Sequence, residues 1–85
     1  MPEVEVYTTP ICPYCSAAKD LLRRKGIAFL EIDVTGEPQR RAEMVARANG
    51  RTTVPQVFVG DTHLGGCDDL YALEDAGELD RLLTT

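Results

Sequence analysis

Alternating polar and apolar positions open the chain and predict its first strand. Valines alternate with glutamates over about 3–8, which is the two-residue period of a half-buried strand. Apolar residues then recur at helical spacing over about 13–25, and positions 28–33 return to a strand pattern. Because a helix separates these two strands, we expect a right-handed βαβ unit with parallel strands.

The middle of the chain predicts a helix followed by a hairpin. An apolar stripe at helical spacing runs over about 37–48 and stops at Asn49-Gly50. Short apolar strands at 57–59 and 62–64 flank Gly60-Asp61, a pair typical of tight turns. We therefore expect these two strands to pair antiparallel.

The last segment predicts one more helix, rich in leucine. Asp68 or Asp69 is expected to cap its start, and Gly77 is a candidate break. The order of elements is then βαβαββα, an α/β arrangement. No repeat or linker interrupts it, so residues 1–85 are expected to form a single domain.

Charge and composition exclude several classes of function. The net charge of −5 and the pI near 4.7 argue against a nucleic-acid-binding protein, which needs clustered cations. No basic and apolar leader opens the chain, and no apolar run is long enough to span a membrane. We expect a soluble, cytoplasmic monomer. An odd number of cysteines, three, fits a reducing compartment better than a disulfide framework.

The segment Cys12-Pro13-Tyr14-Cys15 lies where the first strand gives way to the first helix. This position puts Cys12 at a helix N-terminus, where unpaired N–H groups and the helix dipole favour an anion. The thiolate is the reactive form of cysteine, so Cys12 is expected to be a nucleophile. Cys15 lies one turn further on and should be shielded. The segment therefore predicts a redox site.

A zinc site is the alternative reading of two cysteines at this spacing. It would need two further ligands at similar spacing, and Cys67 and His63 are the only other soft ligands in the chain. Pro13 also fits the first position of a helix better than a metal knuckle. We therefore predict redox chemistry and no metal. His63 is expected to be solvated, Tyr7 to belong to the core, and Cys67 to be an inert spare thiol.

Three motifs together resemble those of the dithiol glutaredoxins, in particular the small bacterial glutaredoxin 3 type. They are Cys12 to Cys15, Thr53-Val54-Pro55, and Gly65 to Asp69, and the resemblance spans nearly all of the chain. It implies a thioredoxin fold with a four-stranded mixed sheet flanked by helices. It further implies a thiol-disulfide oxidoreductase that reduces glutathione mixed disulfides and protein disulfides. Glutathione would be the reducing co-substrate, with no permanently bound cofactor, and ribonucleotide reductase is one candidate protein partner.

The resemblance also assigns roles to individual residues. Cys12 would attack the disulfide, and Cys15 would be the resolving thiol. Pro55 would be a cis proline that lets Val54 pair its backbone with glutathione. The full set of expected glutathione contacts is Tyr14, Thr53, Val54, Pro55, Gly66, Cys67 and Asp68. Asp68 would bind the γ-glutamyl ammonium, although a plain N-cap is an equally good reading of it, and one aspartate can serve as both.

The cations around the site depart from the family pattern. Glutaredoxins often carry a lysine shortly before the first cysteine, where this chain has Thr9. Lys19 is about 10 Å along the helix from Cys12, too far for a direct pair. The glycine carboxylate of glutathione would need another cation, and we favour Arg40 or Arg41 over Arg51. A solvated basic face is an equally good reading of these arginines.

Three other functions are alternatives to a glutathione-dependent oxidoreductase. One is a glutaredoxin-like donor reduced by thioredoxin reductase, which the segment Gly65 to Asp69 argues against. Another is iron–sulfur cluster carriage by a dimer, which the resemblance associates with sites that lack Pro13. The third is a non-catalytic interaction module, which the presence of both Cys12 and Cys15 makes a poor fit.

Overall fold

The alternation of the first strand places it inside a sheet with a core on each face. In the computed structural model, which describes residues 3–84, this strand is β1 (Val4–Thr8). The sheet has the order β2-β1-β3-β4 and contains β2 (Leu30–Asp33), β3 (Gln56–Val59) and β4 (Thr62–Gly65). β1 is parallel to β2 and antiparallel to β3, and β3 is antiparallel to β4. The predicted four-stranded mixed sheet is confirmed.

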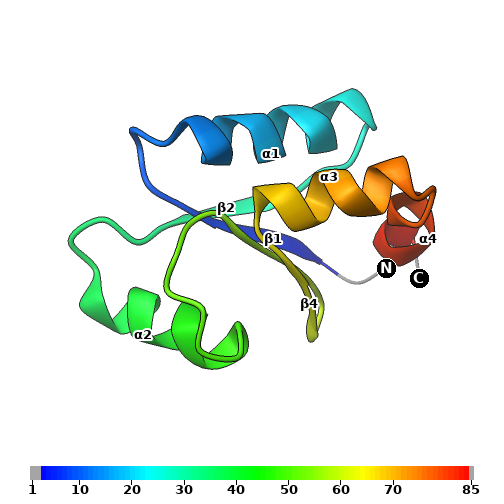
Figure 1. Cartoon of the computed structure of the whole chain (residues 1–85). Helices are drawn as coiled ribbons and strands as arrows, with labels where there is room; N and C mark the ends of the chain where they lie inside the picture. Colours follow the sequence, from blue (N-terminus) through cyan, green and yellow to red (C-terminus); the bar gives the residue numbers. More distant parts are fainter. Residues whose placement is uncertain (1–2, 85) are drawn as a thin grey trace.

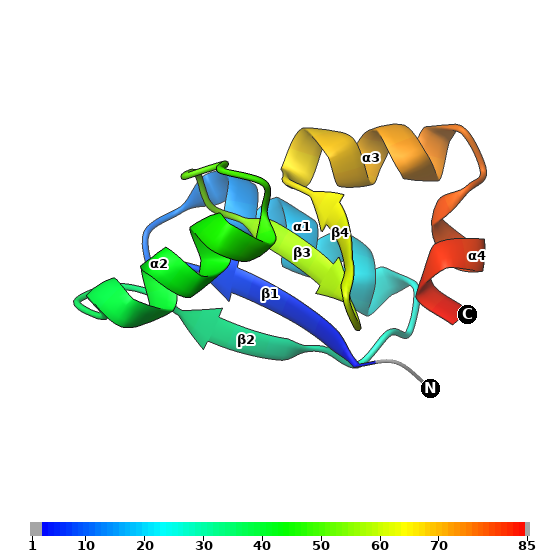
Figure 2. The same cartoon turned by 90° about the horizontal axis from the view of Figure 1, so that it is seen from below.

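Helices cover both faces of this sheet. Those in residues 3–84 are α1 (Pro13–Arg24), α2 (Pro38–Arg47), α3 (Cys67–Asp75) and α4 (Leu79–Thr84). Figures 1 and 2 show α1 and α3 side by side on one face and α2 on the other. The predicted break at Gly77 is present, and its φ of +73° is the left-handed conformation that favours glycine.

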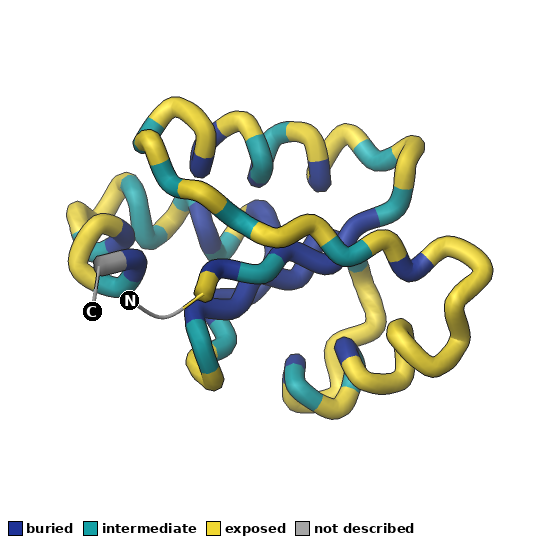
Figure 3. Tube along the Cα trace, turned by 180° about the vertical axis from the view of Figure 1, so that it is seen from behind, coloured by how far each residue is buried: buried dark blue, intermediate teal, exposed yellow. Residues whose placement is uncertain are grey.

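Two hydrophobic cores follow from the alternation along β1 and β3. The valines Val4 and Val6 join the larger core, between the sheet and α1, α3 and α4. Tyr7 points the other way and joins the core beneath α2. Its ring lies edge-on to Phe58 with centroids 5.6 Å apart, and the prediction that Tyr7 is a core residue is confirmed. Figure 3 shows that the buried positions concentrate in the central strands.

The sequence prediction was wrong on two details of the strands. β2 begins at Leu30 rather than at position 28, because its pairing with β1 starts with Leu30 opposite Glu5. His63 is partly buried rather than solvated. Its ring stacks on Phe58 at 5.0 Å, and its Nε2 lies 2.7 Å from Gln56 Oε1. The pairing of β3 with β4 sets His63 opposite Phe58, and burial lowers the pKa of this histidine.

The two ends of α1 lie in different surroundings. At its start, Pro13 occupies the first turn, where its missing N–H is not needed. At its end, the Lys25 Nζ lies 2.7 Å from Glu74 and 2.8 Å from Asp80, which ties α1 to the C-terminal helices.

None of the helices in residues 3–84 combines the length and hydrophobicity that a membrane span requires.

Candidate active site

Cys12 is the N-cap of α1, four residues after the end of the central strand β1. Its Sγ accepts a hydrogen bond of 3.1 Å from the backbone N–H of Cys15. The thiol also donates to the carbonyl oxygen of Val54, 3.9 Å away. Cys12 is partly exposed, so it can meet another sulfur. A sulfur held at unpaired helix N–H groups is well placed to react as the thiolate.

Cys15 lies in the first turn of α1 and faces the core. It is 1% exposed, which confirms the prediction that it is shielded. Burial, with the hydrogen bond to Cys12 as the next cause, raises the pKa of the Cys15 thiol to about 12. Cys15 is therefore protonated at neutral pH while Cys12 stands at the surface. The two sulfurs occupy positions suited to different steps of an exchange reaction.

A hollow of about 340 Å³ lies beside Cys12, on the side of Val54. The peptide bond between Val54 and Pro55 is cis, as predicted. Tyr14 is 65% exposed at the rim, also as predicted. The residues that line the hollow are Tyr14, Arg51, Thr53, Val54, Pro55, Gly66, Cys67 and Asp68. The fold thus brings together all of the predicted glutathione contacts, and it adds Arg51.

The start of α3 is capped differently from the prediction, which named Asp68 or Asp69. The N-cap is Gly66, and its backbone N–H donates to Asp69 Oδ2 at 2.9 Å. Arg51 Nη1 donates to the same oxygen at 2.7 Å, and both contacts lower the pKa of Asp69, Arg51 the more. The N-cap prediction was wrong because a carboxylate at the third helical position can reach back to the cap. Asp68 is exposed at the mouth of the hollow.

The arginines favoured from the sequence are engaged with backbone carbonyls. Arg40 Nη1 donates to the carbonyl oxygen of Asp33 at 3.2 Å, and Arg41 Nη1 to that of Thr52 at 2.9 Å. The side chains of Arg40 and Arg41 are exposed, and neither lines the hollow. The arginine that lines it is Arg51. A role for Arg40 or Arg41 in binding a carboxylate stays a prediction.

Cys67 is the first residue of α3 and also lines the hollow. It is 9% exposed, and burial raises the pKa of its thiol. Since the thiolate is the reactive form, this environment disfavours reaction at Cys67.

Two ion pairs near the site were not foreseen from the sequence. Arg51 with Asp69 joins the loop before Pro55 to α3, and Lys19 with Glu31 joins α1 to the sheet edge. The spacing from Gly66 to Asp69 matches a capping box, and this signal could have identified Asp69. The pairing of Lys19 with Glu31 depends on the packing of α1 over β2, which has no local signal.

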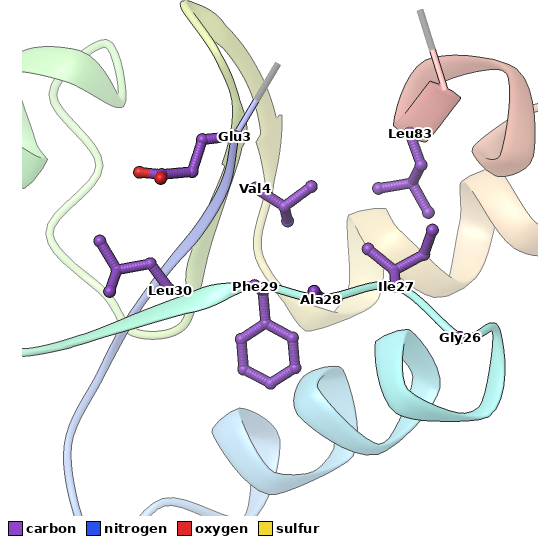
Figure 4. Close-up of a pocket in the computed structure, with 8 residues that line it drawn as sticks. All are labelled: Glu3, Val4, Gly26, Ile27, Ala28, Phe29, Leu30 and Leu83. Carbon is purple, nitrogen blue, oxygen red and sulfur yellow. The ribbon is translucent and has the colours of Figure 1, made fainter. Parts of the chain in front are cut away.

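A larger hollow, of about 520 Å³, lies at the other end of α1. In Figure 4, Val4, Ile27 and Leu83 point toward one another across it. It is mainly apolar, and its one acidic side chain is that of Glu3. Gly26 lines it, whereas Cys12 is at the opposite end of this 12-residue helix, roughly 18 Å away. This hollow is therefore separate from the redox chemistry.

Comparisons with known proteins point to a single family. The glutaredoxin family model matches residues 4–64. A glutaredoxin of Pseudomonas aeruginosa is 61% identical over 84 residues, covering 99% of each chain. Glutaredoxin 3 of Escherichia coli is 54% identical, covering 98% of this chain and 99% of its own. The crystal structure of a buckwheat glutaredoxin–glutathione complex superposes with a TM-score of 0.88 at 31% identity, covering 98% of this chain and 77% of that one. The chain therefore belongs to the glutaredoxin family of thiol-disulfide oxidoreductases.

Proposed function

We propose that the chain uses glutathione to reduce glutathione mixed disulfides and protein disulfides through Cys12 and Cys15. The observation that carries this proposal is the position of Cys12 at the start of α1, beside a hollow that contains the backbone of Val54. The sulfur of Cys12 therefore lies next to a hollow that can receive a short peptide. The buckwheat glutaredoxin that forms a glutathione complex shares this fold, which supports glutathione as the ligand of the groove.

In the first step, the thiolate of Cys12 attacks the glutathione sulfur of a mixed disulfide. The sulfur–sulfur bond of the substrate breaks, and its electron pair leaves with the protein sulfur, which takes up a proton. A bond forms between Cys12 and glutathione. A second glutathione thiolate then attacks the glutathione sulfur of this adduct, which releases oxidised glutathione and restores Cys12. The N–H of Cys15 stabilises the thiolate both as nucleophile and as leaving group.

The hollow offers a binding group for each part of glutathione. The backbone of Val54 suits pairing with the cysteinyl part as an added strand. The unpaired N–H groups at the start of α3 suit the γ-glutamyl carboxylate, and Asp68 suits its ammonium. Arg51 lines the hollow and is a candidate cation for the glycine carboxylate of glutathione. Arg40 and Arg41, which do not line the hollow, are the other two candidates.

Protein disulfides require the second cysteine. Cys12 forms a mixed disulfide with the substrate, and Cys15 attacks Cys12 Sγ to close an internal disulfide. The substrate leaves with the electron pair of the broken bond and takes up a proton. Two glutathione molecules then reduce the internal disulfide. Ribonucleotide reductase is one candidate substrate of this route, and we propose that the protein acts as a monomer.

A coupled assay tests the proposal. Glutathione, glutathione reductase, NADPH and a glutathionylated protein are mixed with the enzyme, and NADPH oxidation is followed. We expect turnover that depends on glutathione and is lost in Cys12→Ser. Turnover with thioredoxin reductase but none with glutathione would instead support the alternative donor. A brown colour in the freshly purified protein, in place of a colourless solution, would support iron–sulfur cluster carriage.

A further inference from the structure

A lysine is held one helical turn behind the buried thiol of Cys15. Lys19 follows Cys15 by four residues in α1, so the two side chains share a face of the helix. The Lys19 side chain is only 18% exposed, and its Nζ lies 3.0 Å from Glu31 Oε2 on the edge strand β2. The same oxygen accepts a 2.8 Å hydrogen bond from the hydroxyl of the fully buried Thr8. The ammonium group is therefore fixed between α1 and the sheet.

This fixed charge acts on Cys15. Burial is the largest influence on the thiol and raises its pKa, and the hydrogen bond and charge of Cys12 act in the same direction. Two influences lower the pKa, a backbone hydrogen bond from Thr9 and the positive charge of Lys19. Lys19 is the cationic side chain among the groups that influence this pKa. Lys19 is the smallest of these influences, and it favours the thiolate of Cys15.

The influences on the pKa of the Cys15 thiol change when Cys12 is bonded to a substrate. The sulfur of Cys12 then carries no charge, so its repulsion of a Cys15 thiolate disappears. Burial still opposes the thiolate, because Cys15 lies in the core. The Thr9 hydrogen bond and Lys19 are the favourable contributions that remain. This intermediate is the state in which Cys15 must react.

We propose that Lys19, held by Glu31, is a positioning residue for the ring-closing attack of Cys15 and takes no part in the attack by Cys12. The inference rests on the proposed dithiol function. Cys15 releases its proton to water, and its sulfur bonds to Cys12 Sγ. The bond between Cys12 and the substrate breaks, and the substrate sulfur leaves with the electron pair and takes up a proton. Cys15 is thereby oxidised, and the substrate sulfur is reduced.

The separation along α1 explains why Lys19 would serve one step only. Lys19 is one turn, roughly 6 Å, from Cys15 and about two turns, roughly 10 Å, from Cys12. A distance of roughly 10 Å exceeds the Debye length of about 8 Å in physiological salt, so the charge of Lys19 is largely screened at Cys12. The remaining charges at this position are Glu31, whose pKa is lowered mainly by Lys19 and Thr8, and Arg23 of α1, which acts on Glu31. Glu31 is therefore ionised at neutral pH and holds the lysine in place.

The two steps can be timed in one experiment. The reduced protein is mixed in a stopped-flow instrument with an equimolar amount of dithiobisnitrobenzoate, an aromatic disulfide that releases a coloured thiolate. Attack by Cys12 releases the first coloured thiolate, and ring closure by Cys15 releases the second. Both rates are recorded from about pH 6 to about pH 10 for the wild type and its variants, a range that spans the ordinary cysteine pKa.

Lys19→Met is expected to leave the first phase unchanged and to slow the second about threefold to tenfold at neutral pH, since a partly screened charge shifts a pKa by up to about one unit. The pH profile of the second phase should move upward. Lys19→Gln keeps a donor for Glu31 but lacks the charge, and should behave like Lys19→Met. Lys19→Arg should retain the wild-type rate. Lys25→Met is the matched control, because Lys25 follows the same helix, is also ion-paired and is 14% exposed.

Three results would overturn the inference. They are a second phase that is as fast in Lys19→Met and Lys19→Gln as in the wild type, a slowing of both phases to the same extent, and a slowing of the second phase in Lys25→Met equal to that in Lys19→Met. The last two would indicate a structural effect on α1. A wild-type protein with no second phase would instead contradict the proposed dithiol function, so the two failures are distinguishable.

Discussion

The backbone N–H of Cys15 donates a 3.1 Å hydrogen bond to the sulfur of Cys12, while the sulfur of Cys15 is buried beneath it. One residue thus supports the nucleophile with its backbone and keeps its own thiol out of solvent. The first turn of α1 produces this difference, because the helix N-terminus presents unpaired N–H groups to its N-cap. The two cysteines therefore have different environments, as the proposed division of steps between them requires.

Asp68→Ala should weaken glutathione binding without destabilising the fold. Asp68 is exposed at the hollow and is not the N-cap of α3, so its loss removes the proposed contact with glutathione and keeps the N-cap interaction. The KM for glutathione should rise about 1.4-fold to fivefold, since an exposed ion pair contributes roughly 0.2–1 kcal/mol. Steady-state kinetics and a thermal melt check this expectation, with the exposed Asp61→Ala as control. A lower melting temperature with an unchanged KM would contradict it.

Asp69→Ala should destabilise the protein in a pH-dependent way. Arg51 and the N–H of Gly66 lower the pKa of Asp69 in the folded state, so its stabilisation is complete above the ordinary aspartate range. It is lost as the pH falls through the lowered folded value. We expect a deficit of about 1 kcal/mol at neutral pH, typical of a lost cap, that shrinks in acid.

Urea unfolding at neutral and acidic pH measures this deficit directly. Asp75→Ala, at the other end of α3, serves as control, because a carboxylate near a helix C-terminus is not favoured by the dipole. A deficit for Asp69→Ala that stays constant down to the lowest pH would show that its carboxylate contributes no charge-dependent stability.

Gly65→Ala should be more destabilising than Gly50→Ala. Both glycines have positive φ, +109° and +91°, so each substitution carries a left-handed penalty of roughly 1–2 kcal/mol. A Cβ at Gly65 would also lie 2.5 Å from Asp69 Oδ2, whereas one at Gly50 meets nothing within 4 Å. The difference in unfolding free energy between the two variants isolates this clash. Equal losses would mean that the Asp69 side chain moves aside without cost.

The order of elements and the redox pair could be predicted because they depend on local pattern. The two-residue period of β1 and the helical period of α1 bracket Cys12 and Cys15 without reference to the rest of the chain. The contacts with glutathione were inferred from family motifs, and the fold brings those residues to one hollow.

The errors occur where distant parts of the chain meet. The sequence predicts a solvated His63, because no local pattern indicates that its ring contacts Phe58 and Gln56 across the hairpin. The sequence places Lys19 too far from Cys12 for a direct pair, and no local pattern predicts its partner on β2. Its ion pair with Glu31 joins α1 to β2, and its effect falls on Cys15.

The most direct test of the account compares Cys12→Ser with Cys15→Ser on two substrates, a glutathionylated protein and a protein with an internal disulfide. Cys12→Ser should lose activity on both, because no other thiol in the site is exposed at a helix N-terminus. Cys15→Ser should retain turnover of the glutathionylated protein, because external glutathione replaces the resolving thiol, and should lose reduction of the internal disulfide. A folded Cys15→Ser protein that is inactive on both substrates would contradict the division of roles between the two cysteines.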